Sequence, residues 1–158
     1  MGMKLLAVTV AVVIAATISV ESNIAASVST PAPELLAERM GVLFLQYRTA
    51  VATFQRQNPG FTGSVPLQSL NALGFQFPQD FLNLVGNTIT PTGINGRVVT
   101  SYGNLPAGAG TVAQKTSQGD SSLGVASGSS WTSYNGVAAT LATSVPDGAV
   151  VSVIQIGN

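Results

Sequence analysis

The sequence predicts an α+β fold in which one long amphipathic helix packs on an antiparallel β-sheet. Apolar residues recur at helical spacing over residues 36–54, and after Gly86 short apolar runs alternate with turn residues. Because the helix precedes the strands instead of alternating with them, this order favours α+β over a parallel α/β fold. A hydrophobic helix is expected in front of this domain.

The N-terminal segment, residues 1–26, contains an uncharged apolar run. This run, LLAVTVAVVIAATISV, extends from Leu5 to Val20 between Lys4 and Glu21. It is slightly shorter than the roughly 20 residues of a typical membrane span. It fits an uncleaved inner-membrane anchor, or a signal peptide removed near Ala26, and either alternative exports the rest of the chain. The expected anchor residues are Leu5, Val8, Val12, Ile14, Ile18 and Val20.

A linker and a long helix follow this segment. Residues 27–33, SVSTPAP, are small, polar and broken by proline, which is typical of a linker, and residues 34–158 are expected to form one exported domain. The helix should end where Pro59 and Gly60 interrupt the pattern. Its apolar stripe should pack on the sheet or on a partner, and it consists of Leu36, Met40, Leu43, Tyr47, Val51 and Phe54.

Two short helical turns are expected between the long helix and the sheet. Pro66 and Pro78 are suited to helix starts, and Gly74 and Gly86 are suited to the ends of these turns.

The strands are predicted from turn residues and apolar runs. Asn95 and Gly96 are the residues that a type I′ hairpin turn prefers, and alternating side chains follow them. Residues 149–156, AVVSVIQI, are apolar on both faces, which indicates a central strand. A shorter strand is expected around residues 123–126.

The composition excludes several classes of function. Charged residues make up 8% of the chain, whereas about 25% is average for a soluble domain. The formal net charge is zero and no basic cluster is present, so we expect no nucleic-acid partner. The chain contains no cysteine and no histidine, which removes thiolate chemistry and the commonest metal ligand. We therefore expect neither a metal site nor a small-molecule cofactor.

Motif searches find no catalytic set. Residues 108–113, GAGTVA, match the dinucleotide-binding pattern formally, but they follow Pro106 instead of a strand, so a flexible loop is expected there. Lys115 and Ser117 are neighbours in this Gly/Ser-rich region, where nothing indicates the burial that would activate a Ser–Lys pair. We expect a protein that is not an enzyme, and a hydrolase with an unrecognised serine nucleophile is the alternative.

Other polar and aromatic residues offer further candidates. Asp80, Asp120 and Asp147 are too dispersed in the sequence to predict paired carboxylates. Trp131 and Tyr134 are flanked by serine and glycine, so they are either an exposed aromatic contact for a sugar or a protein, or core anchors beneath a loop.

Two stretches carry a family resemblance. They are MGVLFLQYRTAVATFQRQNPGFTGSV in the helix and the turn after it, and VPDGAVVSVIQI near the C-terminus. Together with the apolar N-terminal segment and the aromatic-rich middle, they make nearly the whole chain similar to the PilM family of conjugative type IVB (thin) pilus systems. The most specific residues are Tyr47, Arg48, Ala50, Asn58, Pro59, Gly63 and residues 146–150.

The resemblance implies a non-enzymatic structural component of a conjugative type IV pilus biogenesis apparatus, acting in pilin transport or in the basal body. It implies an inner-membrane anchor, a periplasmic C-terminal domain, and pilus-assembly proteins or pilins as partners. More broadly, the helix-then-sheet order resembles type IV pilins. A pilin precursor would have Glu five residues into its mature apolar run, whereas here no acid occurs before Glu21. A minor pilin or adhesin-like subunit, exported to the pilus or cell surface, is the alternative.

Overall fold

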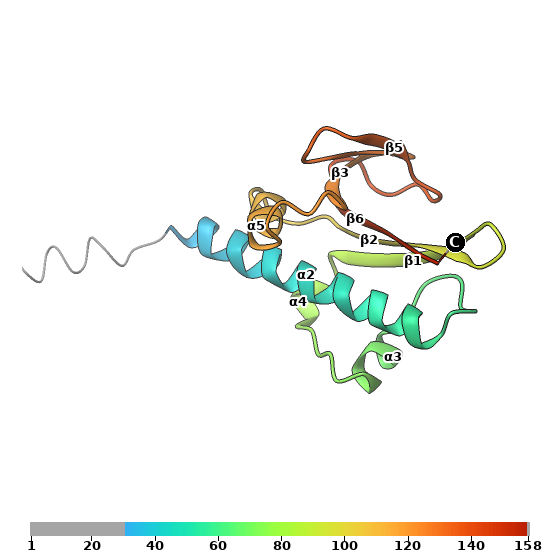
Figure 1. The fold of residues 1–158 in the computed structure, drawn as a ribbon. Coiled ribbons are helices and arrows are strands. Elements are labelled where there is room, and N and C mark those ends of the chain that lie inside the picture. The colour runs from blue at the N-terminus through green and yellow to red at the C-terminus, as the bar shows by residue number, and fades with distance from the viewer. Residues whose placement is uncertain (1–30, 158) are drawn as a thin grey trace, which may run out of the picture. The chain divides into compact units, whose positions relative to one another are not determined.

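The computed structural model describes residues 31–157, and Pro33 onward forms one compact unit. The predicted α+β fold is confirmed: helix α2 (Ala32–Gln57) packs on a six-stranded antiparallel sheet (Figure 1). Within the described residues, no helix is long and apolar enough to cross a membrane. The predicted anchor residues, Leu5, Val8, Val12, Ile14, Ile18 and Val20, lie outside the described part of the chain.

Helix α2 begins two residues earlier than predicted, because Ala32 and Pro33 belong to its first turn, where proline is tolerated. Glu34 in the first turn and Arg56 in the last turn suit the helix dipole. The helix ends at Gln57, and the next residue, Asn58, donates its side-chain amide to the carbonyl of Phe54 at 2.9 Å.

The buried face of α2 is rotated relative to the predicted stripe. Met40, Tyr47 and Val51 are buried as the pattern suggests, but Leu43 and Phe54 are only partly buried and Leu36 is 41% exposed. Small residues explain the rotation, because they let another helix approach closely. A Cβ atom on Gly41 would lie 2.6 Å from the carbonyl oxygen of Ala109. The buried apolar face is therefore centred on Ala37, Met40, Phe44, Tyr47 and Val51.

Three short helices accompany α2. α3 (Leu67–Ala72) and α4 (Gln79–Leu82) start after Pro66 and Pro78, as predicted. The predicted end of the second turn at Gly86 is wrong, because Gly86 lies inside β1. The expected flexible loop at residues 108–113 is also wrong, since α5 (Ala109–Thr116) occupies most of it and buries its small residues.

The strands are β1 (Val85–Thr92), β2 (Gly96–Gly103), β3 (Leu123–Ser127), β4 (Ser130–Ser133), β5 (Ala138–Thr140) and β6 (Val150–Ile156). Their order in the sheet is β1-β2-β6-β3-β4-β5, so β6 is central, as its two apolar faces predict. The expected strand at residues 123–126 is β3.

The β1–β2 hairpin uses a different turn from the one predicted. Thr92 pairs with Gly96, which leaves a three-residue loop at residues 93–95. Gly93 adopts a positive φ of 60°, so it supplies the left-handed conformation that a type I′ turn would have placed at Asn95 and Gly96.

Apolar cores lie on both faces of the sheet. Val150 belongs to the core shared with α2, whereas its neighbour Val151 belongs to a second core with Trp131 and Leu141. Since successive strand residues point to opposite faces, β6 separates the two cores.

Candidate functional site

Tyr47 and Arg48 are neighbours on α2, and they connect the helix to the rest of the domain at separate places. The buried Tyr47 hydroxyl reaches Asn87 on β1, whereas the Arg48 guanidinium reaches Asp120 in the turn before β3. Consecutive residues of a helix are about 100° apart around its axis, so the two side chains leave α2 in different directions. One of these places contains a cavity and the other contains an ion pair.

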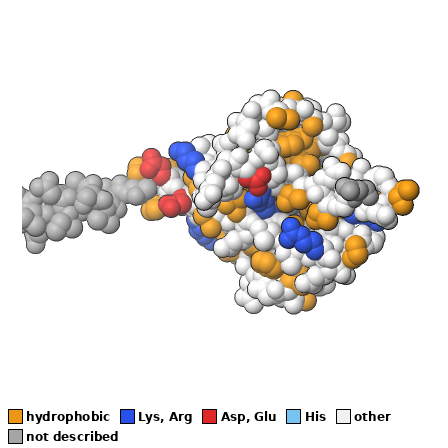
Figure 2. Space-filling model, in the orientation of Figure 1, with side chains coloured by type: hydrophobic (Ala, Val, Ile, Leu, Met, Phe, Trp, Pro, Cys, Tyr) orange, Lys and Arg blue, Asp and Glu red, His pale blue; other side chains and the backbone are white. Residues whose placement is uncertain are grey.

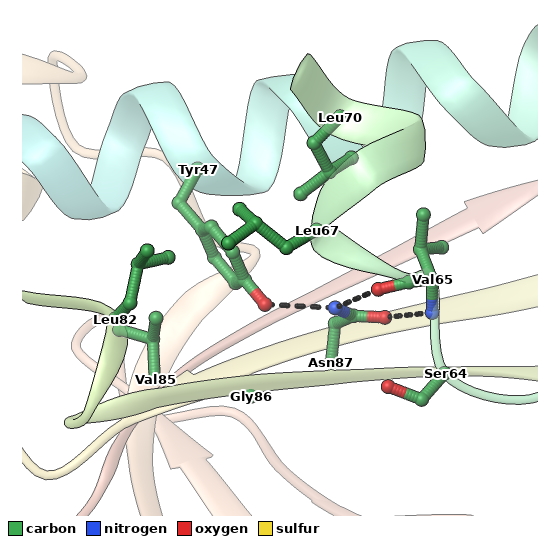
Figure 3. Close-up of a pocket in the computed structure, with 9 residues that line it drawn as sticks. All are labelled: Tyr47, Ser64, Val65, Leu67, Leu70, Leu82, Val85, Gly86 and Asn87. Atoms are coloured by element: carbon green, nitrogen blue, oxygen red, sulfur yellow. Dashed lines mark hydrogen bonds between the residues drawn. The ribbon is translucent and has the colours of Figure 1, made fainter. Parts of the chain in front are cut away.

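The cavity, of about 220 Å³, lies beside Tyr47 between α2, α3, α4 and β1 (Figure 3). Its walls are mostly aliphatic, and the polar side chains on them come from Tyr47, Ser64 and Asn87. Leu67 on α3 is 39% exposed, which places the cavity at the surface of the domain. The lining residues are Tyr47, Ser64, Val65, Leu67, Leu70, Leu82, Val85, Gly86 and Asn87.

Asn87 organises the polar side of this cavity. Its side-chain nitrogen donates to the Tyr47 hydroxyl oxygen at 2.7 Å and to the Val65 carbonyl at 3.3 Å. Its side-chain oxygen accepts from the Val65 backbone N–H at 2.7 Å. The Asn87 amide is therefore fully engaged in positioning Tyr47 and the chain segment that leads into α3.

The Tyr47 phenol is held neutral at physiological pH. Burial raises the pKa of Tyr47, and the opposing effect of the hydrogen bond from Asn87 is smaller. Phe77 and Phe81 meet the ring edge-on, with centroids at 5.5 and 6.0 Å, and so fix its orientation. Because the phenol oxygen already accepts from Asn87, its proton is free to be donated to a group in the cavity.

The cavity is suited to uncharged groups. None of its lining side chains is ionised, since Tyr47 is neutral and the others are aliphatic, hydroxyl or amide groups. Charged side chains are also few on the face of the domain shown in Figure 2. The cavity offers apolar walls and the hydroxyl groups of Tyr47 and Ser64 as hydrogen-bond donors, but no nucleophile–base pair. This arrangement supports binding and gives no basis for catalysis.

The second place is a closed polar cluster around Arg48. The guanidinium Nη1 lies 2.7 Å from a carboxylate oxygen of Asp120 and donates to the Ser122 hydroxyl at 2.9 Å. A longer hydrogen bond of 3.4 Å reaches Ser152 on the central strand β6. The other Asp120 oxygen accepts from the Ser122 backbone N–H at 2.8 Å. These contacts connect the middle of α2 to the middle of the sheet.

The charge state of Asp120 indicates a structural role for this cluster. Desolvation would raise the pKa of Asp120, but hydrogen bonds from Ser122 and Arg48 outweigh it, so the pKa lies below the ordinary value. The carboxylate is therefore ionised and paired with Arg48 at neutral pH, and its lowered pKa makes it a weaker base toward Ser122 or Ser152 than a free carboxylate. Nothing in this cluster favours the hydrolase alternative.

The other candidate residues are not brought together. Asp80 pairs with Arg39 at 3.2 Å on the surface, and the Asp147 carboxylate accepts from the Gly128 backbone N–H. Lys115 lies in the last turn of α5, where the Ser117 hydroxyl donates to the Gln114 carbonyl at 3.0 Å. In the described residues, no group of three or more acidic, histidine or cysteine side chains is placed to hold a metal ion.

The proposed exposed aromatic contact is corrected by the structure. Trp131 is only 8% exposed and packs in the core between the sheet and the segment after β5, with Leu141 and Val145. Tyr134 is partly buried against the core of the α2 face, which raises its pKa. Trp131 is therefore a core anchor, the second of the two alternatives that the sequence left open.

The partners of Tyr47 and Arg48 come from distant segments and were not predicted from the sequence. Asn87 lies 40 residues from Tyr47, and Asp120 lies 72 residues from Arg48. The signal that was available is the Tyr47–Arg48 pair, which the family resemblance singled out without giving it a role.

Comparisons with known proteins agree on one family. The family model described as PilM matches residues 8–153. The crystal structure of a protein named PilM from Escherichia coli B7A has the same fold, with a TM-score of 0.59 at 13% sequence identity, over 80% of this chain and 97% of that one. No curated protein matches the chain. Because the family match extends over nearly the whole sequence, the chain belongs to the PilM family.

Proposed function

We propose that this protein is a non-enzymatic structural component of a conjugative type IV pilus biogenesis apparatus, acting in pilin transport or in the basal body. The observation that carries this proposal is the PilM family match over residues 8–153. The match includes most of the apolar run as well as the α+β domain, so both parts are characteristic of the family. In this proposal, residues 1–26 anchor the protein in the inner membrane and the domain acts in the periplasm.

The arrangement of the domain supports a role in protein contacts. The charged groups of the Arg48 cluster bind one another and connect α2 to the sheet. The cavity beside Tyr47 has mostly apolar walls and can be reached from the surface. The alternative of a minor pilin or adhesin-like subunit has less support, because Trp131, one of the two aromatic residues offered as its contact, is buried, and Tyr134 is partly buried.

Deletion and cell fractionation test the proposal. Deleting the gene should abolish or strongly reduce pili on the cell, and full-length protein should fractionate with the inner membrane. Full-length protein in sheared pili would instead support the minor-pilin alternative. Soluble periplasmic protein cut after Ala26 would exclude the anchor. Unchanged pilus numbers in the deletion strain would contradict the proposed function as a whole.

A further inference from the structure

Strand β1 forms one edge of the sheet, and only part of its free edge is paired. Ile89 exchanges two backbone hydrogen bonds with Gly63, of 2.8 and 2.9 Å, on the side away from β2. In an antiparallel ladder, the backbone groups of alternate residues point to the same side. The N–H and C=O groups of Asn87 and Val85 therefore also point away from β2.

The Asn87 side-chain amide, and not the Asn87 backbone, forms the hydrogen bonds to Val65 that a regular ladder would contain. Two residues beyond Gly63, Val65 would be expected to pair with the backbone of Asn87. Instead, both Val65 backbone groups bind the Asn87 side-chain amide. Within residues 31–157, the backbone N–H and C=O groups of Asn87 and Val85 consequently have no backbone partner.

This unpaired edge is next to the cavity, where Val85 is partly buried and Asn87 is 5% exposed. Val85, Gly86 and Asn87 line the cavity and also form this part of β1, as Figure 3 shows. A volume of about 220 Å³ is below the roughly 300–1,000 Å³ of sites for drug-sized ligands, so it suits a single side chain. Unpaired edge groups beside a side-chain pocket are the two elements by which sheets bind extended peptides.

We propose that the cavity and the unpaired edge of β1 at Val85 and Asn87 bind an extended, uncharged segment of a pilus-assembly protein. One aliphatic side chain of this segment enters the cavity, and its backbone pairs with β1. The absence of charge on the lining selects an uncharged segment, because a buried, unpaired charge would be costly. The Tyr47 hydroxyl donates to a carbonyl of the bound segment. The identity of the partner rests on the proposed function, whereas the binding chemistry does not.

Model peptides test the binding chemistry on the full-length protein. The probes are acetylated and amidated pentapeptides of sequence STXTS, with leucine, glycine or aspartate at X. We expect the leucine peptide to bind about tenfold more tightly than the other two, since one buried aliphatic side chain supplies that factor. Amide NMR should show shifts at Val85 and Asn87 and slower hydrogen exchange of the Asn87 amide.

Three outcomes of this experiment would overturn the proposal. They are the absence of shifts at Val85 and Asn87 up to millimolar peptide, equal binding of the leucine and aspartate peptides, and shifts confined to another surface. A concentration-dependent dimer in which β1 is the interface would show that a second copy of the chain is the occupant instead.

A pair of variants links the cavity to binding. Leu67→Glu places a charge at the mouth of the cavity, and it should weaken binding of the leucine peptide at least tenfold. The variant should still unfold cooperatively. Val137→Glu is the matched control, because Val137 is 61% exposed on the loop between β4 and β5. Equal affinity of the two variants would contradict the proposal.

Cell assays with the same variants separate this proposal from the proposed function. In a deletion strain, Val137→Glu should restore pili and Leu67→Glu should not. If deletion itself leaves pilus numbers unchanged, the proposed function fails and with it the partner's identity. If deletion removes pili but Leu67→Glu restores them fully, the function stands and the cavity is not the docking site.

Discussion

Tyr47 and Arg48 are adjacent in the sequence, yet the regions that they organise differ in one essential respect. Around Arg48, charged and hydroxyl groups from α2, the turn before β3 and β6 bind one another, and the cluster is closed. Around Tyr47, the contacts are uncharged, a cavity is left, and part of the β1 edge is unpaired. The Arg48 cluster therefore connects the helix to the sheet, whereas the Tyr47 region is where we propose that a partner binds.

The largest effect is expected from Phe44, which lies one turn before both residues and is fully buried. Phe44→Ala should lower the free energy of unfolding by about 3–5 kcal/mol, because it leaves a cavity in the core that α2 shares with the sheet. Urea denaturation measures this loss. Leu36→Ala serves as the control and should change stability by less than about 1 kcal/mol, since Leu36 is exposed. Similar losses for the two variants would show that the buried face of α2 is wrongly placed.

Arg48→Met is expected to have the next largest effect and tests whether the charged cluster is structural. It leaves Asp120 partly buried without its cation, so stability should fall by about 2–3 kcal/mol at neutral pH. Peptide binding at the cavity should be unchanged in the folded variant. A change in stability below about 0.5 kcal/mol, measured by urea denaturation, would contradict the structural role.

Tyr47→Phe should have a smaller effect on stability, about 1 kcal/mol, because it removes one hydrogen-bond partner of Asn87 and keeps the ring. The same variant should weaken binding of the leucine peptide several-fold, since the donor to the bound carbonyl is lost. Thermal melts and peptide titration measure the two effects. Unchanged peptide affinity would remove the Tyr47 hydroxyl from the binding site.

The smallest effects are expected in the dependence of stability on pH, where Asp120 acts at the acid end and Tyr47 at the alkaline end. The lowered pKa of Asp120 contributes stability above its ordinary value of 3.8, and this is lost as the pH falls through the folded-state pKa. The raised pKa of Tyr47 contributes stability below 10.0, and this is lost as the pH rises through the folded-state pKa. Stability–pH curves of Asp120→Asn and Tyr47→Phe should therefore differ from wild type in the acid and alkaline limbs respectively.

The elements that the sequence predicts correctly have strong local signals. The stripe and the proline–glycine stop predict α2, and the apolar run at residues 149–156 predicts the central strand β6. Helix α5 was missed because its buried residues are alanine and glycine, which give little hydrophobic periodicity. The predicted stripe of α2 shares Met40, Tyr47 and Val51 with the buried face, but it is centred on large apolar residues such as Leu36, whereas α5 approaches closely at Gly41.

The candidate site was less predictable than the fold. The predicted stripe includes Tyr47, but its role depends on Asn87, an amide whose position opposite the helix follows only from strand register. The unpaired edge of β1 arises because the Asn87 side chain binds Val65, a tertiary contact that no local pattern encodes. The serine and glycine residues around Trp131 fit a buried ring and an exposed ring equally well, so the sequence could not predict its burial.

Native-state hydrogen exchange of three amides in β1 tests the central claim most directly. Val85, Asn87 and Ile89 point to the same side of the strand, but Ile89 is paired with Gly63. In the free, full-length protein, the Ile89 amide should exchange slowly, and the Val85 and Asn87 amides should exchange at least tenfold faster. Equal protection of all three amides would show that the edge of β1 is already covered and would contradict an open binding site beside Tyr47.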